Sequence, residues 1–277
     1  MSGPLDGYRV IDLTTMVSGP FATMILGDQG AEVVKIEPLR EGEHMRKGSN
    51  RSGGFAANFL NNNRNKRSIA VNLKDPKGCA IVTSLAEKAD IFIQNFRPGV
   101  IERLGLGEKD VRKVKKDIIY VSITGFGETG PYAQKRVYDP IIQAASGLAS
   151  IQGGSDKSRP RLVRTILPDK LTGITAAQAV TAALLTRERT GKGQHVRLSM
   201  LDTVLSFLWA SDMGGQTFFD QSNNSQSPAS FIDLIYETKN GYMSVAVMSD
   251  SEWRGLAFAL DRNDLREQVT SLLAKYS

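Results

Sequence analysis

One carboxylate stands at the start of the segment best suited to chemistry, PDKLTGITAAQAVTAALLTRERTGKGQHVRLSMLD at 168–202. Asp169 comes just before Leu171-Thr172-Gly173, and a long run of small and apolar residues typical of a helix follows. A carboxylate at the beginning of a helix feels the positive end of the helix dipole and the unpaired first-turn N–H groups. Asp169 is therefore either the N-cap, where Asp is favoured, or a nucleophile whose oxyanion those groups stabilise. The segment by itself favours the cap.

The chain has few residues that could support other kinds of catalysis. Cys79 is the only cysteine, which excludes an internal disulfide and is typical of a reducing cytosol. Its apolar helical surroundings indicate a buried small hydrophobe. His44 and His195 are the only histidines, so a His-rich metal site is excluded and a Ser-His-Asp triad is poorly supplied. We therefore expect no metal centre.

Residues 125–130, GFGETG, match G-x-G-x-x-G directly after an expected strand. The pattern is that of a dinucleotide site. However, Pro131 follows at once, and the next residues, YAQKR, have no amphipathic helix pattern whose N-terminus could bind a pyrophosphate. The motif also comes late in the sheet rather than at the first strand–helix turn. A glycine-rich turn leading into a substrate loop is the interpretation that we prefer.

The composition is that of a soluble globular protein. The 277 residues, 41% hydrophobic and 23% charged, supply one large domain or two ordinary ones. The net charge is +6, but the basic residues are dispersed and not interleaved with aromatics, so we expect no nucleic-acid partner. No apolar run approaches the ~20 residues of a membrane helix, and the N-terminus has no secretory signal pattern. We expect a cytoplasmic protein without a membrane partner.

Strand and helix patterns alternate along the first two hundred residues. Strands are expected at 8–13, 31–36, 67–73, 90–94, 118–124 and 195–200. Helices are expected at 18–28, 75–89, in two short stretches between 94 and 118, and at 138–150, 172–189 and 201–213. Ser18 is the expected N-cap of the first helix, with Pro20 in its first turn. This alternation predicts an α/β fold with a mostly parallel sheet and helices on both faces.

A change of composition at 214–230, GGQTFFDQSNNSQSPAS, marks the best candidate linker. It separates an expected large domain over 1–213 from a smaller α+β domain over 231–277. Within the smaller domain, 234–247 predicts a hairpin around Asn240-Gly241, a strong turn signal. Helices are expected near 251–260 and 263–275.

Taken together, these segments resemble the class III (family III) CoA-transferases, the superfamily that includes the α-methylacyl-CoA racemases. The matching motifs, in order, are LDGYRVIDLT with SGPFAT, GAEVVKIE, NRNKRSIAVNLKDPKG, ADIFIQNFRPGVIERLGL, IIYVSITGFGETGPY, YDPIIQAASGL, and DKLTG with RERTGKGQHVRLSMLD. They cover essentially the whole chain. The resemblance implies a Rossmann-like α/β large domain, a smaller domain, and a homodimer of interlocked ring-shaped subunits.

The resemblance also implies a reaction. Asp169 would attack an acyl-CoA thioester, and CoA would pass to a carboxylic acid acceptor through acyl-aspartyl anhydride and aspartyl-CoA thioester intermediates. CoA is then a substrate, and no permanently bound cofactor is implied. The implied CoA-binding positions are Val17, Ser18, Val71, Lys74, Asn95, Phe96, Arg103, Leu104, Arg136, Tyr138 and Met200. Arg40 would take the role of the basic residue that the formyl-CoA branch often has at the position of Pro38. The residues alone indicate ordinary surface charges at Lys74, Arg103 and Arg136, and a strand-terminal turn at Asn95-Phe96.

Two alternatives stay open beside the transferase. The first is an acyl-CoA racemase or epimerase of the same superfamily. In the racemase branch, one base is a histidine that directly precedes an Asp. The same segment reads Tyr138-Asp139 here, and a tyrosine is a poor base at neutral pH. The second is a truncated, catalytically poor CoA-binding protein, because members of this family are considerably longer. A formyl-specific enzyme is not expected, since 214–230 keeps only Gly214-Gly215 of that branch's glycine run.

Overall fold

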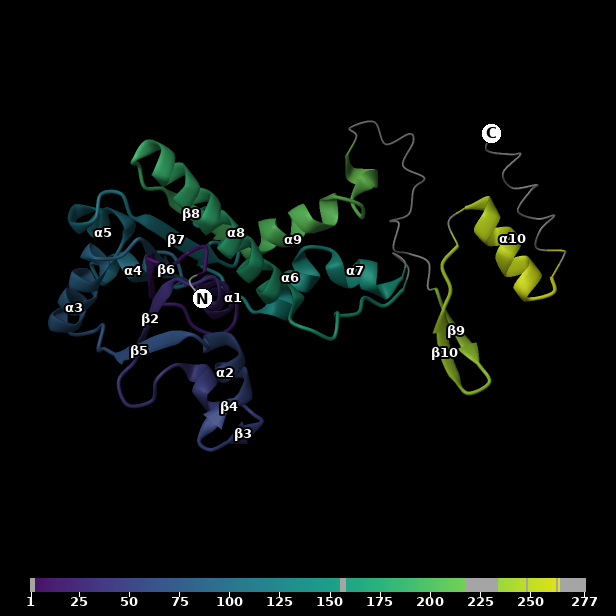
Figure 1. Cartoon of the computed structure of the whole chain (residues 1–277), viewed down its shortest axis with the longest axis horizontal. Helices are drawn as coiled ribbons and strands as arrows, with labels where there is room; N and C mark the ends of the chain where they lie inside the picture. The colour runs from purple at the N-terminus through teal and green to yellow at the C-terminus, as the bar shows by residue number, and fades with distance from the viewer. Residues whose placement is uncertain (1–2, 155–157, 218–233, 248, 263, 265–277) are drawn as a thin grey trace. The chain divides into compact units, whose positions relative to one another are not determined.

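The computed structural model describes residues 3–154, 158–217, 234–247, 249–262 and 264. The chain divides into two units, Met1–Pro228 and Ala229–Ser277. In the described part of the larger unit, six strands form a parallel sheet in the order β5-β2-β1-β6-β7-β8 (Figure 1). The strands are β1 Arg9–Asp12, β2 Glu32–Glu37, β5 Lys66–Ala70, β6 Ile91–Gln94, β7 Ile119–Thr124 and β8 His195–Ser199. The expected mixed α/β fold with a parallel sheet is confirmed.

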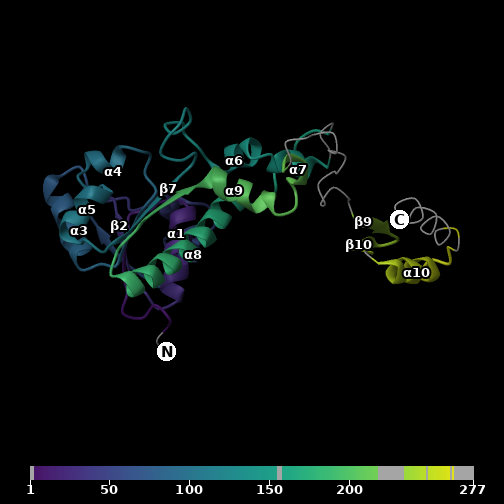
Figure 2. The same ribbon diagram turned by 90° about the horizontal axis from the view of Figure 1, so that it is seen from above.

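Alternate residues of each strand point to opposite faces of the sheet, and both faces are apolar. Val10 of β1 packs in the core beneath α1 and α8, whereas its neighbour Ile11 packs in the core beneath α3, α4 and α5. Figure 2 shows these two groups of helices on either side of the strands. The helices are α1 Ser18–Asp28, α3 Pro76–Glu87, α4 Val100–Arg103, α5 Glu108–Val114 and α8 Leu167–Thr190. Strands buried on both faces read as continuous apolar runs, which is why the sequence predicts them well.

Helices α1 and α8 pack against each other at very short range. A Cβ added at Gly173 of α8 would lie 2.8 Å from the Ser18 carbonyl oxygen and 2.9 Å from the Phe21 ring. Only glycine fits this approach, and the alanines Ala176 and Ala177 continue the contact into the core. The small residues noted in the sequence therefore bring the first turn of α8 to the first turn of α1.

Several boundaries differ from those expected. The helix expected over 138–150 is two helices, α6 Asp139–Ala145 and α7 Leu148–Gly153, because Gly147 has φ 84° and turns the chain between them. The last helix of this unit, α9, spans Met200–Trp209 and is followed by the short η2 Gly214–Gln216. The elements η1 His44–Lys47, β3 Arg51–Ser52, β4 Phe55–Ala56 and α2 Ala57–Asn63 were not anticipated.

The smaller unit holds an antiparallel hairpin and a helix. Strands β9 Ile235–Thr238 and β10 Gly241–Ser244 pair antiparallel with Gly241 opposite Thr238. The hairpin is present as expected, but its turn is Lys239-Asn240 and Gly241 is the first residue of β10. Helix α10 Asp250–Ala259 begins with a capping box between Ser249 and Glu252. The helix expected near 263–275 lies outside the described residues. Among the described residues, no helix combines the length and apolar character needed to cross a bilayer.

Candidate active site

A cavity of about 370 Å³ lies beyond the carboxyl ends of β1, β6 and β7. This edge of a parallel sheet is where ligands usually bind. The first turns of α8 and α9 complete its wall. The sequence-predicted residues that line the cavity are Ser18, Asn95, Phe96, Arg136, Tyr138, Asp169 and Met200. The fold thus gathers into one cavity seven positions that are spread over the sequence from residue 18 to residue 200.

Asp169 lies in the first turn of α8 but does not cap it. Ile166 occupies the N-cap position and makes no side-chain cap hydrogen bond, so the N-cap interpretation of Asp169 is wrong. The helix starts five residues before the expected Thr172, with Pro168 in its first turn. The Asp169 carboxylate instead interacts with the backbone N–H and hydroxyl of Ser18 at the start of α1. Ser18 is not an N-cap either, because Val17 holds that position.

Asp139 is a site residue that sequence reasoning missed. Its carboxylate is 4% exposed, and Oδ2 accepts a 3.2 Å hydrogen bond from the backbone N–H of Asp169. Its Oδ1 accepts a 2.7 Å bond from Gln143, which in turn holds the chain before α8 through the N–H of Val163 and the carbonyl of Thr165. The signal was the Asp-Pro pair that opens a helix at 139. Nothing in the sequence shows that this helix start faces α8.

The charge of Asp139 affects the ionisation of Asp169. Burial, followed by the nearby charge of Asp139, raises the pKa of Asp169 from 3.8 to about 6, although both hydrogen-bonding groups of Ser18 lower it. Asp169 is therefore less well solvated than a surface carboxylate, and its ionised form is held by an N–H group at the positive end of α1. A carboxylate in this setting can act as a nucleophile once it is deprotonated.

Asn95 lines the cavity with its carboxamide already engaged. Its Oδ1 accepts from the Thr15 N–H at 2.9 Å, and its Nδ2 donates to the Thr15 carbonyl at 2.8 Å. Neighbouring Phe96 is partly buried and packs against the core beneath α3. The strand-end position of both residues agrees with the sequence. What the structure adds is that the Asn95 side chain secures the loop after β1.

The rim of the cavity is cationic. Arg97 and Lys135, which sequence reasoning did not single out, line it together with Arg136, and all three are exposed. Lys135 also lies 3.7 Å from the centre of the Tyr132 ring. Such a rim complements an anionic ligand.

The glycine-rich segment at 125–130 leads into this rim, since no helix follows it before Asp139. Gly125 itself lines the cavity, and a Cβ there would meet Val137 at 2.0 Å. The absence of a following helix agrees with the rejection of a dinucleotide site.

The remaining predicted positions lie elsewhere. Val71 is a core residue, and Leu104 packs against the same core beneath α3. Val17 is buried at the start of α1, whereas Lys74 and Arg103 are exposed. The structure does not bring any of these five side chains to the 370 Å³ cavity. Cys79 is only partly buried, and its thiol donates to the Leu73 carbonyl at 3.2 Å.

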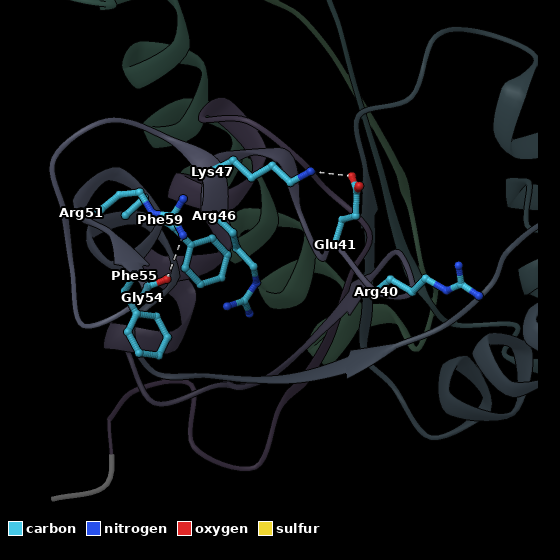
Figure 3. A pocket seen from close by; sticks show the side chains of 9 residues that line it. Arg40, Glu41, Arg46, Lys47, Arg51, Gly54, Phe55 and Phe59 are labelled. Carbon is cyan, nitrogen blue, oxygen red and sulfur yellow. Dashed lines mark hydrogen bonds and ion pairs between the residues drawn. The ribbon is translucent and has the colours of Figure 1, made fainter.

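Arg40 lines a second cavity of about 520 Å³, formed by the loop after β2, the β3–β4 hairpin and α2 (Figure 3). Two of its cations have carboxylate partners: Arg46 bonds Glu37 through Nε at 2.6 Å, and Lys47 pairs with Glu41 at 2.8 Å. The Arg46 guanidinium also stacks 3.9 Å from the centre of the Phe59 ring. The sequence of this region has no clear periodicity, so its cavity was not foreseen.

Fold and site together define an α/β protein with a carboxylate-centred, cation-rimmed cavity at the carboxyl edge of a parallel sheet. The sequence profile described as CoA-transferase family III matches residues 5–272. The chain therefore belongs to the CoA-transferase family III. It is 37% identical over 269 residues to human succinyl-CoA:glutarate CoA-transferase, covering 95% of this chain and 60% of that protein. It is 44% identical over 206 residues to Acetobacter aceti acetyl-CoA:oxalate CoA-transferase, covering 74% and 53%.

Solved structures give the same result. The crystal structure of Rv3272 from M. tuberculosis matches with a TM-score of 0.83 and 32% identity, covering 95% of this chain and 70% of that one. A CAIB/BAIF family protein from Brucella suis also matches with a TM-score of 0.83, at 31% identity. The chain spans only 53–60% of the length of the first curated relatives that it matches.

Proposed function

We propose that this chain carries the CoA-binding and nucleophile-bearing part of an enzyme that transfers CoA from an acyl-CoA thioester to a carboxylic acid. The observation that carries the proposal is the partly buried Asp169 carboxylate, which meets Ser18 inside a cavity with a cationic rim. Family membership supports a CoA thioester as the donor. The relatives named for glutarate and oxalate transfer support a dicarboxylic acid as the acceptor.

The reaction that we propose exchanges acyl groups without net proton transfer. The Asp169 carboxylate attacks the thioester carbonyl, the C–S bond breaks, and CoA leaves as a thiolate while an acyl-aspartyl anhydride forms. The thiolate then attacks the aspartyl carbonyl, which releases the donor acid and leaves an aspartyl-CoA thioester. The acceptor carboxylate attacks this thioester, the C–S bond breaks, and CoA leaves again as a thiolate while a second anhydride forms between the acceptor and Asp169. CoA attacks the acceptor's carbonyl, so acyl-CoA leaves and Asp169 is again a carboxylate.

Each wall of the cavity has a role in this sequence. Ser18 orients the carboxylate, and Asp139 holds the backbone of Asp169 while its charge keeps the pKa of Asp169 raised. Arg97, Lys135 and Arg136 would attract the phosphates or carboxylates of the substrates. A homodimer stays a prediction of the family resemblance.

Incubation with a series of acyl-CoA thioesters tests the proposal. Intact-mass measurement should detect a covalent adduct of the acyl group or of CoA, and peptide mapping should place it on Asp169. An adduct on another residue would contradict the nucleophile. A chain that binds CoA by calorimetry but never forms an adduct would be a CoA-binding protein rather than a catalyst.

The pH dependence of adduct formation follows from the raised pKa of Asp169. Because only the ionised carboxylate attacks, and its pKa is raised to about 6, the rate should rise from about pH 5 and level off above about pH 7. An ordinary surface aspartate would already have reached its plateau at about pH 5. Pre-steady-state mass measurement at fixed ionic strength gives the profile. A rate that is flat across this range would show that Asp169 does not limit the step.

The racemase alternative makes a different prediction. Removing the α-proton of a thioester on either face requires two bases. Tyr138 stands where the racemase branch has a histidine, and its side chain is 65% exposed. We therefore expect no deuterium uptake from heavy water into 2-methylacyl-CoA, measured by mass spectrometry. Rapid uptake would make this chain a racemase or epimerase.

A further inference from the structure

The loop that joins β1 to α1 is held by side chains from other elements. The backbone N–H of Thr14 donates to Asp12 Oδ1 at 2.8 Å, and its carbonyl accepts from Lys35 Nζ at 2.8 Å. Both backbone groups of Thr15 bond Asn95, as described above. Asp12, Lys35 and Asn95 thus each bond the loop. A fourth side chain, that of Glu43, bonds it at Met16.

Glu43 holds the most constrained residue of this loop. Met16 has φ 68°, in the left-handed region that costs energy for any residue with a Cβ. Its N–H donates to Glu43 Oε1 at 2.8 Å, and Met16 itself lines the 370 Å³ cavity. Two residues later comes Ser18, the partner of Asp169. The turn at Met16 thus decides where α1 begins relative to the carboxylate.

Glu43 is itself fixed within the protein. Its side chain and that of Lys35 are each 1% exposed, and Oε2 lies 2.8 Å from Lys35 Nζ, as an ion pair without the angles of a hydrogen bond. Its own backbone N–H donates to Glu37 Oε2 at 2.9 Å. A buried ion pair contributes little net stability compared with apolar residues of the same size. Its presence beside a strained turn points to a role in shaping the site.

We propose that Glu43 and Lys35 form a positioning pair for CoA transfer. Through the Met16 N–H, Glu43 stabilises the left-handed turn and so sets Ser18 against Asp169. Lys35 neutralises Glu43 and holds the preceding carbonyl of Thr14. The inference rests on the proposed function, because its main effect is read as the rate at which Asp169 forms an adduct.

Two double variants isolate the hydrogen bond to Met16. Lys35→Met with Glu43→Gln removes both charges and keeps an acceptor oxygen, whereas Lys35→Met with Glu43→Leu removes the acceptor too. We expect the leucine variant to form the adduct about 10- to 100-fold more slowly, because a displacement near 1 Å has an effect of that order. Both should stay folded at the assay temperature, although the leucine variant should melt lower because the Met16 N–H loses its acceptor. Glu32→Gln removes a partly exposed ion-pair partner of Arg9 from β2, the strand that carries Lys35, and should leave the rate unchanged.

A third substitution separates positioning from general damage. Glycine adopts a positive φ without strain, so Met16→Gly added to the leucine variant should restore most of the lost rate. Equal rates in the two double variants, or no recovery with Met16→Gly, would overturn the proposal.

If the parent chain forms no adduct, the proposed function is wrong. The positioning role of Glu43 and Lys35 can still be tested, because amide hydrogen exchange reports the loop between β1 and α1 directly. Exchange over residues 13–18 should be faster in the leucine variant than in the glutamine variant, and Met16→Gly should slow it again. Unchanged exchange would overturn the role.

Discussion

Replacing Asp169 with asparagine is expected to end adduct formation and CoA transfer while making the folded chain more stable near neutral pH. An amide is a poor nucleophile, so no anhydride can form. Asparagine has nearly the size of aspartate and can still accept from Ser18, so the loss reports the missing carboxylate rather than a collapsed cavity. Asp169→Ala should lose turnover as well. Turnover with an acyl-CoA and a dicarboxylic acid, followed together with intact mass, measures the effect.

The gain in stability follows from the raised pKa of Asp169. The folded chain holds this proton more tightly than the unfolded chain, so the favourable contribution is complete below about pH 4 and is lost as the pH rises through about 6. A shift of this size corresponds to ~3 kcal/mol for a fully buried group, and partial exposure reduces it to about 1–2 kcal/mol. Urea titration should find this gain for Asp169→Asn at about pH 7.5 and none at about pH 4. An Asp169→Asn chain with parental turnover would show that the nucleophile lies elsewhere.

Lys66→Met should cause the largest loss of stability. Lys66 is 2% exposed, and its Nζ lies 3.1 Å from Oδ2 of the fully buried Asp12. It also donates to the Pro20 carbonyl and to Asn63 Oδ1, each at 2.8 Å. Methionine fills the space but removes the cation that contacts the buried Asp12 charge, so we expect the free energy of unfolding to fall by about 3–5 kcal/mol. Lys88→Met, at an exposed helix end, is the matched control and should change stability little.

The deficit of Lys66→Met should shrink in acid. In the parent, burial favours the neutral form of Asp12, but the charges of Lys66 and Lys35 and hydrogen bonds from Thr14 and Thr23 outweigh it and lower the pKa to about 2. Without Lys66, the pKa of Asp12 rises, because the largest of the opposing charges is lost while burial still favours the neutral form. The variant then regains stability as the pH falls, because protonation removes the buried charge. Burial lowers the pKa of Lys66 to about 8, so the parent pair is fully charged only below that pH. Urea titrations of both chains at about pH 6.5 and about pH 4 test the prediction, and a constant deficit would contradict it.

The sheet could be read from the sequence because its signals are local. The central strands β6 and β7 are apolar on both faces, and β6 is followed after a short loop by the start of α4. The ends of successive parallel strands meet at one edge, and Asn95 and Gly125 line the cavity found there. Asp169 was expected just before a helix, whereas it lies in the first turn of α8 and does not cap it.

The roles of individual side chains were not readable, because they depend on contacts between distant segments. Asp139 reaches Asp169, 30 residues away in sequence, only because α6 and α8 begin side by side. Val71 was expected at the ligand because its motif matches, yet it packs in the core. Glu43 belongs to a segment without periodicity, and its partner Lys35 lies in a strand where a charge usually faces solvent. Sequence patterns identify the helices and strands, whereas the role of a side chain depends on its burial and on its partners in the folded chain.

The close packing of α1 against α8 has a consequence for synthesis of the chain. Ser18 and Asp169 are separated by 151 residues (169 − 18), so the first helix leaves the ribosome long before its packing partner. At ~5–20 residues per second, the apolar face of α1 waits ~8–30 s for α8 to be made. β1 waits too, because its neighbour β6 begins 79 residues after Asp12 (91 − 12). The nascent chain therefore carries an unfinished central strand and an uncovered helix for most of its elongation, and translation speed and chaperone supply should govern how much of it folds.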